Sequence, residues 1–362
     1  MWAFNLLRVA KREEPGGRFS VVPNFLLEIA MSFTRKVLAT AALATLLCSA
    51  AHAETLRLST LKHPGSPGEL AAQELAKEVE ARTEGRVTIK VYPSDQLGDY
   101  TEVYEQLMQG VVDMALQPVP ALDDKRVAIT WFPYAFTNYE SAEEMHKPGG
   151  AVFEIINGAT REMNVTVLGV YGEGMGGAGF AKDVNDAGNP DAKHDLKVRV
   201  WPGGATHQAL LERLGFSTGT LPWAELYTGM QTGIVDGQVG GTAAMALESF
   251  KDITKTWVQY NDHFEANWFL ISDDSLAKLS EEDQNTLREV VQELSAKRWV
   301  EVKQADEAAL EEFRKLGANV ITFDDATLEK FADVVRKDVW PKIAGELGDE
   351  GYAQLKAGLG LE

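Results

Sequence analysis

The sequence predicts an α/β fold with two lobes and one long helix that runs across both of them. Apolar segments that alternate like strands are followed by segments of helical spacing, first over residues 56–116 and again over residues 165–237. This alternation is typical of α/β lobes with a largely parallel sheet. Residues 281–316 contain no proline or glycine and keep apolar residues at helical spacing, which predicts a helix of about 50 Å, longer than one lobe is wide.

The first series opens with a strand over residues 56–61, where apolar and polar residues alternate. A helix follows, for which Ser66 is the predicted N-cap and Pro67 the first helical residue, and Glu69 completes a predicted capping box. The rest of this series comprises a strand over residues 87–91, a helix over 99–109 and an apolar strand over 111–116.

The second series repeats this alternation. It comprises strands over residues 165–171 and 197–201, helices over 206–214 and 223–232, and the end of a strand at 235–237. We therefore expect lobe I to consist of residues 54–175 and about 264–303, and lobe II of residues 176–263 and about 304–362.

Residues 31–53 have the composition of a secretory leader. Arg35 and Lys36 precede an apolar run of about fifteen residues, and an A-x-A cleavage signal ends the segment. A retained membrane anchor is the alternative, but such an anchor needs about 20 apolar residues. We expect cleavage before Glu54 and a periplasmic protein that does not insert into the membrane. Residues 1–30 resemble no targeting signal, so we interpret them as a spurious or untranslated extension.

The charge of the chain excludes several kinds of partner. Asp and Glu number 54 and Lys and Arg 35, a net charge of −19. Loss of the first 53 residues leaves 51 acidic and 29 basic residues, a net charge of −22. Such a chain attracts neither nucleic acid nor an anionic membrane. A bound anion must therefore meet a local positive group.

Residues 172–177 match the pattern G-x-G-x-x-G after a predicted strand. A dinucleotide site also needs a helix that opens there, but the polar, breaker-rich residues 183–190 follow. We interpret the motif as a flexible crossover between lobes. The sequence has no G-x-S-x-G elbow, Cys/His pair or acidic metal loop. It therefore predicts no catalysis, no cofactor and no metal.

Arg199 is the most informative polar residue, because Val198 and Val200 place it on a predicted strand. A guanidinium offers a planar fork of donors that matches a carboxylate. An exposed arginine or a structural ion pair is the equally weighted alternative. Trp201 and Trp223 can wall a ligand pocket, although aromatic residues more often belong to the core.

Several motifs together resemble the DctP-type solute receptors of tripartite ATP-independent periplasmic (TRAP) transporters. The resemblance covers residues 54 to about 323. The motifs are EGRV at 84–87, VYP at 91–93, QLG at 96–98, QGVVDMA at 109–115, FPYAF at 132–136, DLKVRV at 195–200 and ELYTGMQTGIVDGQ at 225–238.

The resemblance implies a periplasmic-binding-protein fold, whose two lobes close over a ligand. It makes Arg199 the carboxylate clamp and Trp223 an aromatic ligand contact, and it places His63 and His263 in loops near the cleft. The candidate ligand-binding residues are Arg199, Trp223, Trp201, His63, Gly240, His263 and Glu173.

The chain departs from the family pattern at two places. Val239 and Gly240 stand where relatives often carry Glu-Asn, and residues 176–182 lack an arginine found in many relatives. The first departure also removes a metal ligand of some relatives that bind α-keto acids. These differences disfavour a long, multiply charged acid such as a sialic acid.

The resemblance thus implies a receptor that binds a small organic anion, most simply a carboxylate, in the cleft between the lobes. It would deliver this ligand to the small and large membrane subunits of a TRAP transporter and catalyse nothing. The alternative is an exported enzyme acting on small organic acids. A third hypothesis is a ligand-sensing module for a signalling partner.

Overall fold

The structure, a computed structural model, describes residues 53–121 and 124–361. The predicted segments 1–30 and 31–53 lie outside the described residues, apart from Ala53. The strands are β1 (Glu54–Thr60), β2 (Val87–Tyr92), β3 (Met114–Gln117), β4 (Val165–Phe180), β5 (Lys197–Val200), β6 (Ser217–Thr220), β7 (Gly237–Thr242), β8 (Thr256–Val258), β9 (Phe264–Ser272) and β10 (Asn319–Ile321). The helices are α2 (Pro67–Arg82), α3 (Tyr100–Met108), the 3₁₀ helix η1 (Lys125–Trp131), α4 (Tyr139–His146), α5 (Ala151–Arg161), α6 (Ala205–Arg213), α7 (Trp223–Gln231), α8 (Ala243–Phe250), α9 (Asp273–Leu276), α10 (Glu281–Lys315), α11 (Asp325–Asp338) and α12 (Trp340–Gly358).

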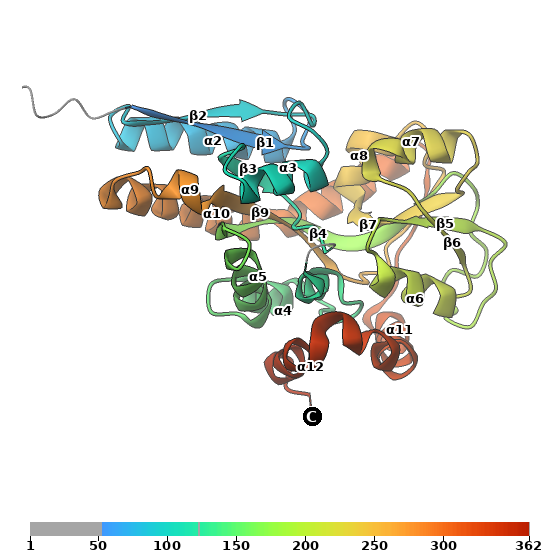
Figure 1. Cartoon of the computed structure of the whole chain (residues 1–362). Helices are drawn as coiled ribbons and strands as arrows, with labels where there is room; N and C mark the ends of the chain where they lie inside the picture. Colours follow the sequence, from blue (N-terminus) through green and yellow to red (C-terminus); the bar gives the residue numbers. More distant parts are fainter. Residues whose placement is uncertain (1–52, 122–123, 362) are drawn as a thin grey trace, which may run out of the picture. The chain divides into compact units, whose positions relative to one another are not determined.

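The strands form a sheet with two distinct halves (Figure 1). Along the sheet the strands follow the order β2-β1-β3-β9-β4-β7-β5-β6, and β8 pairs with both β4 and β10. In the first half β1 pairs in parallel with β2 and β3. In the second half β5 pairs in parallel with β6 and β7. The fold class predicted from the sequence, with its parallel strands and helical layers, is confirmed.

The strand β4 is shared by both halves. Its residues from Val165 to Met175 pair with β9, whereas those from Gly176 to Phe180 pair with β7 and, near the end, with β8. The change of partner falls at the predicted end of the first part of lobe I. The lobe boundaries themselves stay a prediction.

The glycine-rich motif lies inside β4, where every residue is buried. Aromatic rings lie over two of these glycines. A Cβ atom on Gly172 would lie 2.8 Å from the Phe264 ring, and one on Gly177 would lie 2.7 Å from the Trp257 ring. Glycine is therefore required for close packing across the strands. The strand continues through the motif and no helix opens there, so the rejection of a dinucleotide site agrees with the local structure.

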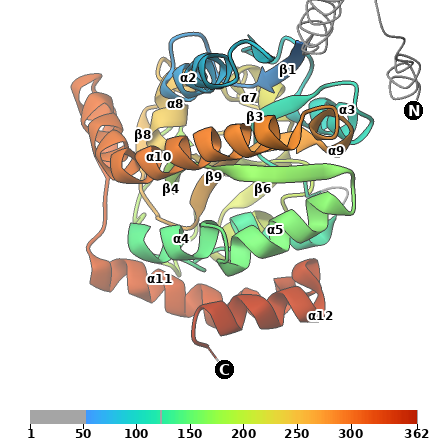
Figure 2. The ribbon, with the colours of Figure 1, turned by 90° about the vertical axis from the view of Figure 1, so that its left-hand side faces the viewer.

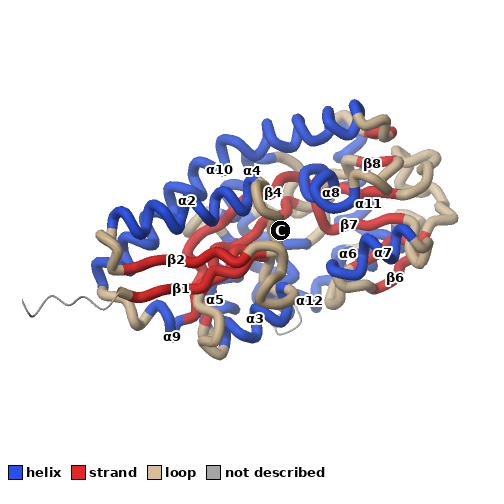
Figure 3. Tube along the Cα trace, turned by 90° about the horizontal axis from the view of Figure 1, so that it is seen from above, coloured by secondary structure: helices blue, strands red, loops and turns tan. Residues whose placement is uncertain are grey.

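The predicted long helix is present as α10 (Figures 2 and 3). It contacts α2, β4, α8 and β10. Ser280 caps its N-terminus by accepting a hydrogen bond from Asp283 N at 3.1 Å. Among the described residues, no helix is long and apolar enough to cross a membrane.

The two C-terminal helices brace the segment that follows η1. The Trp340 side chain donates to Pro133 O at 2.8 Å, and the Arg336 guanidinium donates to Tyr134 O at 3.1 Å. Helix α12 contacts η1 and α5 on one side and α6 on the other. It thus packs against one helix of the second series and against the segment that lies between the two series in the sequence.

Two local predictions are wrong. Ser66 is the N-cap of α2 with Pro67 after it, but its side chain makes no capping hydrogen bond. Glu69 instead accepts from Gly65 N at 3.0 Å, so the capping box is absent. Residues 235–237 do not end a strand, because β7 begins at Gly237. Both errors concern where the backbone hydrogen bonds go, which the local sequence pattern leaves open.

Gly174→Ala should lower the free energy of unfolding by about 3 kcal/mol. Gly174 has φ +128°, and an added Cβ would lie 2.2 Å from Asp306 Oδ2. That oxygen accepts hydrogen bonds from Met175 N at 2.7 Å and from the Tyr139 hydroxyl at 2.5 Å. The substitution therefore strains the backbone and displaces a buried carboxylate that fastens α10 to β4. Urea denaturation measures the effect.

Gly158→Ala is the matched control for this prediction. Gly158 lies within α5 and an added Cβ would contact nothing within 4 Å. Because alanine favours a helix over glycine, this variant should gain up to about 1 kcal/mol. A Gly174→Ala protein as stable as the wild type would contradict the tight packing of α10 on β4.

Candidate functional site

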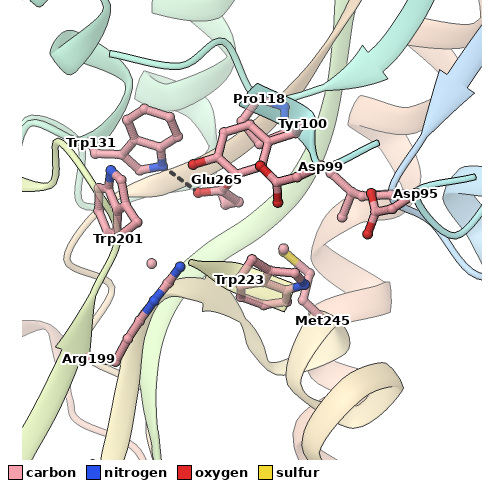
Figure 4. A pocket seen from close by; sticks show the side chains of 12 residues that line it. Asp95, Asp99, Tyr100, Pro118, Trp131, Arg199, Trp201, Trp223, Met245 and Glu265 are labelled. Atoms are coloured by element: carbon pink, nitrogen blue, oxygen red, sulfur yellow. Dashed lines mark hydrogen bonds between the residues drawn. The ribbon is translucent and has the colours of Figure 1, made fainter. Parts of the chain in front are cut away.

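A cavity lies between the two halves of the sheet (Figure 4). The space between its walls, including the part open to solvent, is about 500 Å³. One wall comes from β5, α7, β7 and α8, and the other from the first series together with η1 and β9. The lining residues are Leu61, Asp95, Asp99, Tyr100, Pro118, Trp131, Arg199, Trp201, Trp223, Gly240, Met245 and Glu265.

Arg199 enters the cavity from β5 and is 2% exposed. Its Nε donates to Leu221 O at 2.9 Å, which fixes the plane of the guanidinium. The guanidinium carbon lies 5.6 Å from the centre of the Trp223 ring. None of the described residues forms an ion pair with it. Burial lowers the pKa of Arg199 to about 10, so the side chain is still charged at neutral pH. The outer edge of the fork is available to an anion (Figure 4).

Trp201 and Trp223 form aromatic walls on either side of Arg199 (Figure 4). Trp201 also packs against Trp131 from the opposite wall, with ring centres 5.2 Å apart. Gly240 has φ +91°, and an added Cβ would lie 2.4 Å from the Trp201 ring. The glycine therefore leaves room for the tryptophan to line the cavity. Arg199, Trp201, Trp223 and Gly240 are the candidate residues that the structure brings together.

Three carboxylates lie on the wall that faces Arg199. Asp95 follows β2, Asp99 is the N-cap of α3, and Glu265 lies on β9. Burial, with a contribution from the charge of Asp99, raises the pKa of Asp95 to about 6. Glu265 is 1% exposed and accepts a hydrogen bond from the Trp131 indole at 2.7 Å. The cavity therefore has a positive side and a negative side.

His263 lies behind the cavity rather than in its lining, and it is fully buried. Its Nδ1 lies 2.9 Å from Asp262 Oδ2, and its Nε2 lies 3.1 Å from Glu265 Oε2. Burial lowers the pKa of His263, but the charges and hydrogen bonds of Asp262 and Glu265 outweigh this effect and raise it to about 10. His263 is thus a protonated donor to both carboxylates. It acts on the cavity through Glu265.

His207, Asp262 and His263 are close enough together to hold a metal ion, with ligand atoms within 4.8 Å of one another. These atoms already hydrogen-bond to each other, and His207 Nε2 lies 2.7 Å from Asp262 Oδ2. A protonated His263 has no lone pair for a metal. The arrangement fits a buried ion-pair network better than a metal site, and the absence of a metal stays a prediction.

Glu173 and His63 lie outside the cavity lining. Glu173 forms a buried ion pair with Lys62 at 2.7 Å and accepts from Asn267 Nδ2 at 2.5 Å. His63 is exposed, and its Nδ1 lies 3.2 Å from Ser94 Oγ. In this structure both have structural partners, and their role as ligand contacts stays a prediction.

The sequence reasoning missed most of the wall opposite Arg199. The overlooked polar and aromatic residues are Asp95, Asp99, Tyr100, Trp131 and Glu265. Asp99 and Tyr100 had one usable signal, because they open a predicted helix directly after a strand and a turn, where ligands commonly bind. Glu265 lies between the apolar residues Phe264 and Ala266 on a strand that is buried throughout, which gave no such signal.

Comparison with known proteins places these features in a family. The sequence model of DctP, bacterial extracellular solute-binding protein family 7, matches residues 58–346. The chain belongs to the DctP family. The predicted resemblance to DctP-type TRAP receptors is thereby confirmed.

Individual relatives of the DctP family agree over most of the chain. A solute-binding protein of Roseobacter denitrificans is 26% identical over 249 residues, 67% of this chain and 74% of the relative. The ectoine-binding periplasmic protein TeaA of Halomonas elongata is 24% identical over 342 residues, 90% of this chain and 96% of the relative. A TRAP periplasmic solute-binding protein of Desulfovibrio salexigens, solved with orotic acid, shares the fold, with a TM-score of 0.75, 20% identity and coverage of 84% of this chain and 97% of that one.

Membership of the DctP family has direct consequences for function. The chain is a solute receptor and not an enzyme, so the predicted class is confirmed and the exported-enzyme alternative is not favoured. Proteins of this family are extracellular or periplasmic, and TRAP receptors work with membrane subunits.

Proposed function

We propose that the chain is the periplasmic receptor of a TRAP transporter and holds a small organic acid in the cavity, with the acid's carboxylate on the fork of Arg199. The supporting observation is the state of Arg199: a charged guanidinium, 2% exposed, that forms no ion pair with any described residue. Burying an unpaired charge costs several kcal/mol. A ligand carboxylate supplies the missing partner.

Closure of the lobes would strengthen this ion pair. Water leaves the cavity as the lobes approach, and the attraction between opposite charges grows as the local dielectric constant falls. The crossing segments at residues 171–177 and 262–268 are the proposed hinges, with the lobe boundaries expected from the sequence. A ligand that contacts both walls binds the closed form more tightly than the open form. Binding therefore shifts the receptor toward the closed form. The closed receptor would then deliver the acid to the small and large membrane subunits.

The relatives support a small acid as cargo. One solved relative, from Bordetella pertussis, binds pyroglutamic acid, and others bind D-glucuronate or D-erythronate. Among the described residues that line the cavity there is one arginine, which suits one carboxylate rather than several. A cleavable leader at residues 31–53 would bring the receptor to the periplasm, with Glu54 as the first residue of the exported protein.

A thermal-shift screen of the purified protein tests the proposal. The panel comprises monocarboxylates, keto acids, hydroxy acids, sugar acids, amino acids, ectoine and sulfonates. A ligand present at 100 times its Kd should stabilise the protein by about 2.7 kcal/mol. Analysis of the same mixtures by mass spectrometry should show every acid unchanged. Stabilisation by no member, or turnover of the stabilising acid, would contradict the receptor.

A further inference from the structure

We propose that the ligand is a zwitterion, a small acid whose carboxylate binds Arg199 and whose N–H cation binds Glu265. This inference rests on the proposed function, because it takes Arg199 as the carboxylate site. It goes further by assigning a second polar group of the ligand and the residue that selects it.

The first argument is the charge of the cavity walls. Among the described residues that line the cavity, Arg199 is the single cation, while Asp95, Asp99 and Glu265 are carboxylates. Figure 4 shows Arg199 on one side and the three carboxylates on the other. A ligand with only negative charge would satisfy Arg199 but would lie beside like charges, which is unfavourable in a water-poor site. A ligand with a cation at its other end can pair with opposite charges on both sides of the cavity.

The second argument is the hydrogen bonding of Glu265. Its Oε2 is occupied, because the Trp131 indole lies at 2.7 Å and His263 Nε2 at 3.1 Å. No described residue donates to Oε1. Oε1 is therefore free to accept a hydrogen bond from a ligand in the cavity. An N–H cation supplies a charge-assisted hydrogen bond, which is stronger than a neutral one.

The ion-pair network behind the cavity places one positive charge between two carboxylates, one of which is Glu265. His263 carries this charge, and Asp262 is the other carboxylate. Burial lowers the pKa of His207, so this neighbour is neutral and adds no charge. The network therefore has a net charge of about −1 at neutral pH, on the opposite side of the cavity from Arg199.

The aromatic walls and the net charge of the protein agree with this assignment. Trp131, Trp201 and Trp223 line the cavity, and indole faces attract cations. The net charge, −22 once the first 53 residues are lost, repels anions at low salt but does not repel a zwitterion, which carries no net charge. Recognition of a purely anionic ligand would work against both features.

Matched pairs of acids test the inference by titration calorimetry. The pairs are L-proline with cyclopentanecarboxylate, L-pipecolate with cyclohexanecarboxylate, and 5-aminovalerate with hexanoate. The members of each pair share a carboxylate and a similar shape, and they differ in the N–H cation. We expect the amino member of the best-fitting pair to bind at least about 30-fold more tightly.

Each outcome of the titrations with matched acids answers a different question. Equal or tighter binding of the carbon analogues overturns the zwitterion and leaves the receptor intact. If no pair binds but the wider screen yields a ligand, an N–H cation in that ligand supports the inference and its absence overturns it. If no acid of either kind binds, the proposed function itself fails.

Glu265→Gln tests the assigned residue. The amide oxygen can still accept from Trp131, while the amide nitrogen presents a donor to the cavity. The amino member should lose about 30-fold or more in affinity, and the carbon analogue should bind equally well or better. Glu225→Gln, at an exposed position on α7, is the matched control and should change neither. Equal losses for both members would indicate a purely structural role and overturn the assignment.

Asp99→Asn provides a second variant should Glu265→Gln fail to fold. Asn caps a helix as well as Asp does, so α3 keeps its N-cap. The substitution removes one negative charge from the same wall. We expect a smaller shift in the same direction, of about 3- to 10-fold in the ratio of the two affinities. An unchanged ratio in both variants would contradict charge selection by this wall.

Discussion

Arg199→Ala should reduce the affinity for the bound acid by at least about 100-fold and abolish ligand-induced thermal stabilisation. The guanidinium is the single cation among the described cavity-lining residues, and its Nε is anchored to Leu221 O at 2.9 Å. Loss of the side chain leaves the ligand carboxylate buried without a partner. Titration calorimetry with the best ligand of the screen measures the loss.

The stability of Arg199→Ala separates a binding role from a folding role. The substitution removes a buried charge, which is favourable, and leaves a small cavity, which is unfavourable. We expect these effects to offset each other to within about 1 kcal/mol, so that the variant unfolds cooperatively near the wild-type midpoint in urea. Arg199→Lys keeps the charge without the fork and should bind with intermediate affinity.

Arg161→Ala is the control for this pair of variants. Arg161 is exposed at the end of α5, away from the cavity lining. Its replacement should leave both affinity and stability unchanged within error. Full retention of ligand affinity by Arg199→Ala would exclude the guanidinium as the carboxylate site.

Asp262→Asn should lower the free energy of unfolding at pH 7 by about 3–5 kcal/mol. Asp262 is 1% exposed, and its Oδ2 lies 2.7 Å from His207 Nε2 and 2.9 Å from His263 Nδ1. Burial alone raises the pKa of Asp262, but the two histidines outweigh it and hold the pKa well below its usual range. The variant leaves His263 with Glu265 as its single negative neighbour. Urea denaturation measures the change.

The pH dependence of stability identifies the same network. The pKa of His263 rises from 6.5 in the unfolded chain to about 10 in the fold. The stabilisation by its bound proton is therefore complete below pH 6.5 and is lost as the pH rises toward 10. The loss from this one proton has a slope of at most about 1.4 kcal/mol per pH unit. In Asp262→Asn the decline between pH 6.5 and 10 should be clearly shallower.

Asp252→Asn is the matched control, because Asp252 is exposed in the turn after α8. It should unfold like the wild type at every pH. Parallel stability profiles for Asp262→Asn and the wild type between pH 6.5 and 10 would contradict the protonated state of His263. This outcome would also weaken the charge balance on which the zwitterionic ligand rests.

Much of the fold could be predicted from local pattern. The helix Glu281–Lys315 has the predicted start, and its end lies within one residue of the prediction. The helices α3, α6 and α7 also match to within a residue or two, because caps and apolar spacing act over a few neighbouring residues. The capping box at Ser66 failed because Glu69 bonds Gly65 N instead.

The site likewise contains residues that could be predicted from the sequence and residues that could not. Arg199 could be found from sequence because it lies in a motif of the second series, and Trp223 because it resembles an aromatic ligand contact of the family. Glu265 and Trp131 could not, since they meet through a hydrogen bond of 2.7 Å across 134 positions of sequence. The charge of His263 could not be predicted either, because it depends on the side chains that lie beside it in the fold.

The sequence by itself determined the α/β class, the long helix and the resemblance to the family, and it singled out Arg199 as the candidate carboxylate site. These features depend on spacing, composition and side-chain chemistry within short segments. Only the tertiary structure decided which carboxylates face Arg199 and that a protonated His263 lies behind one of them. The physical reason is that burial and long-range neighbours set the charge of a site, and both arise only when β5 and β9 are brought together around one cavity.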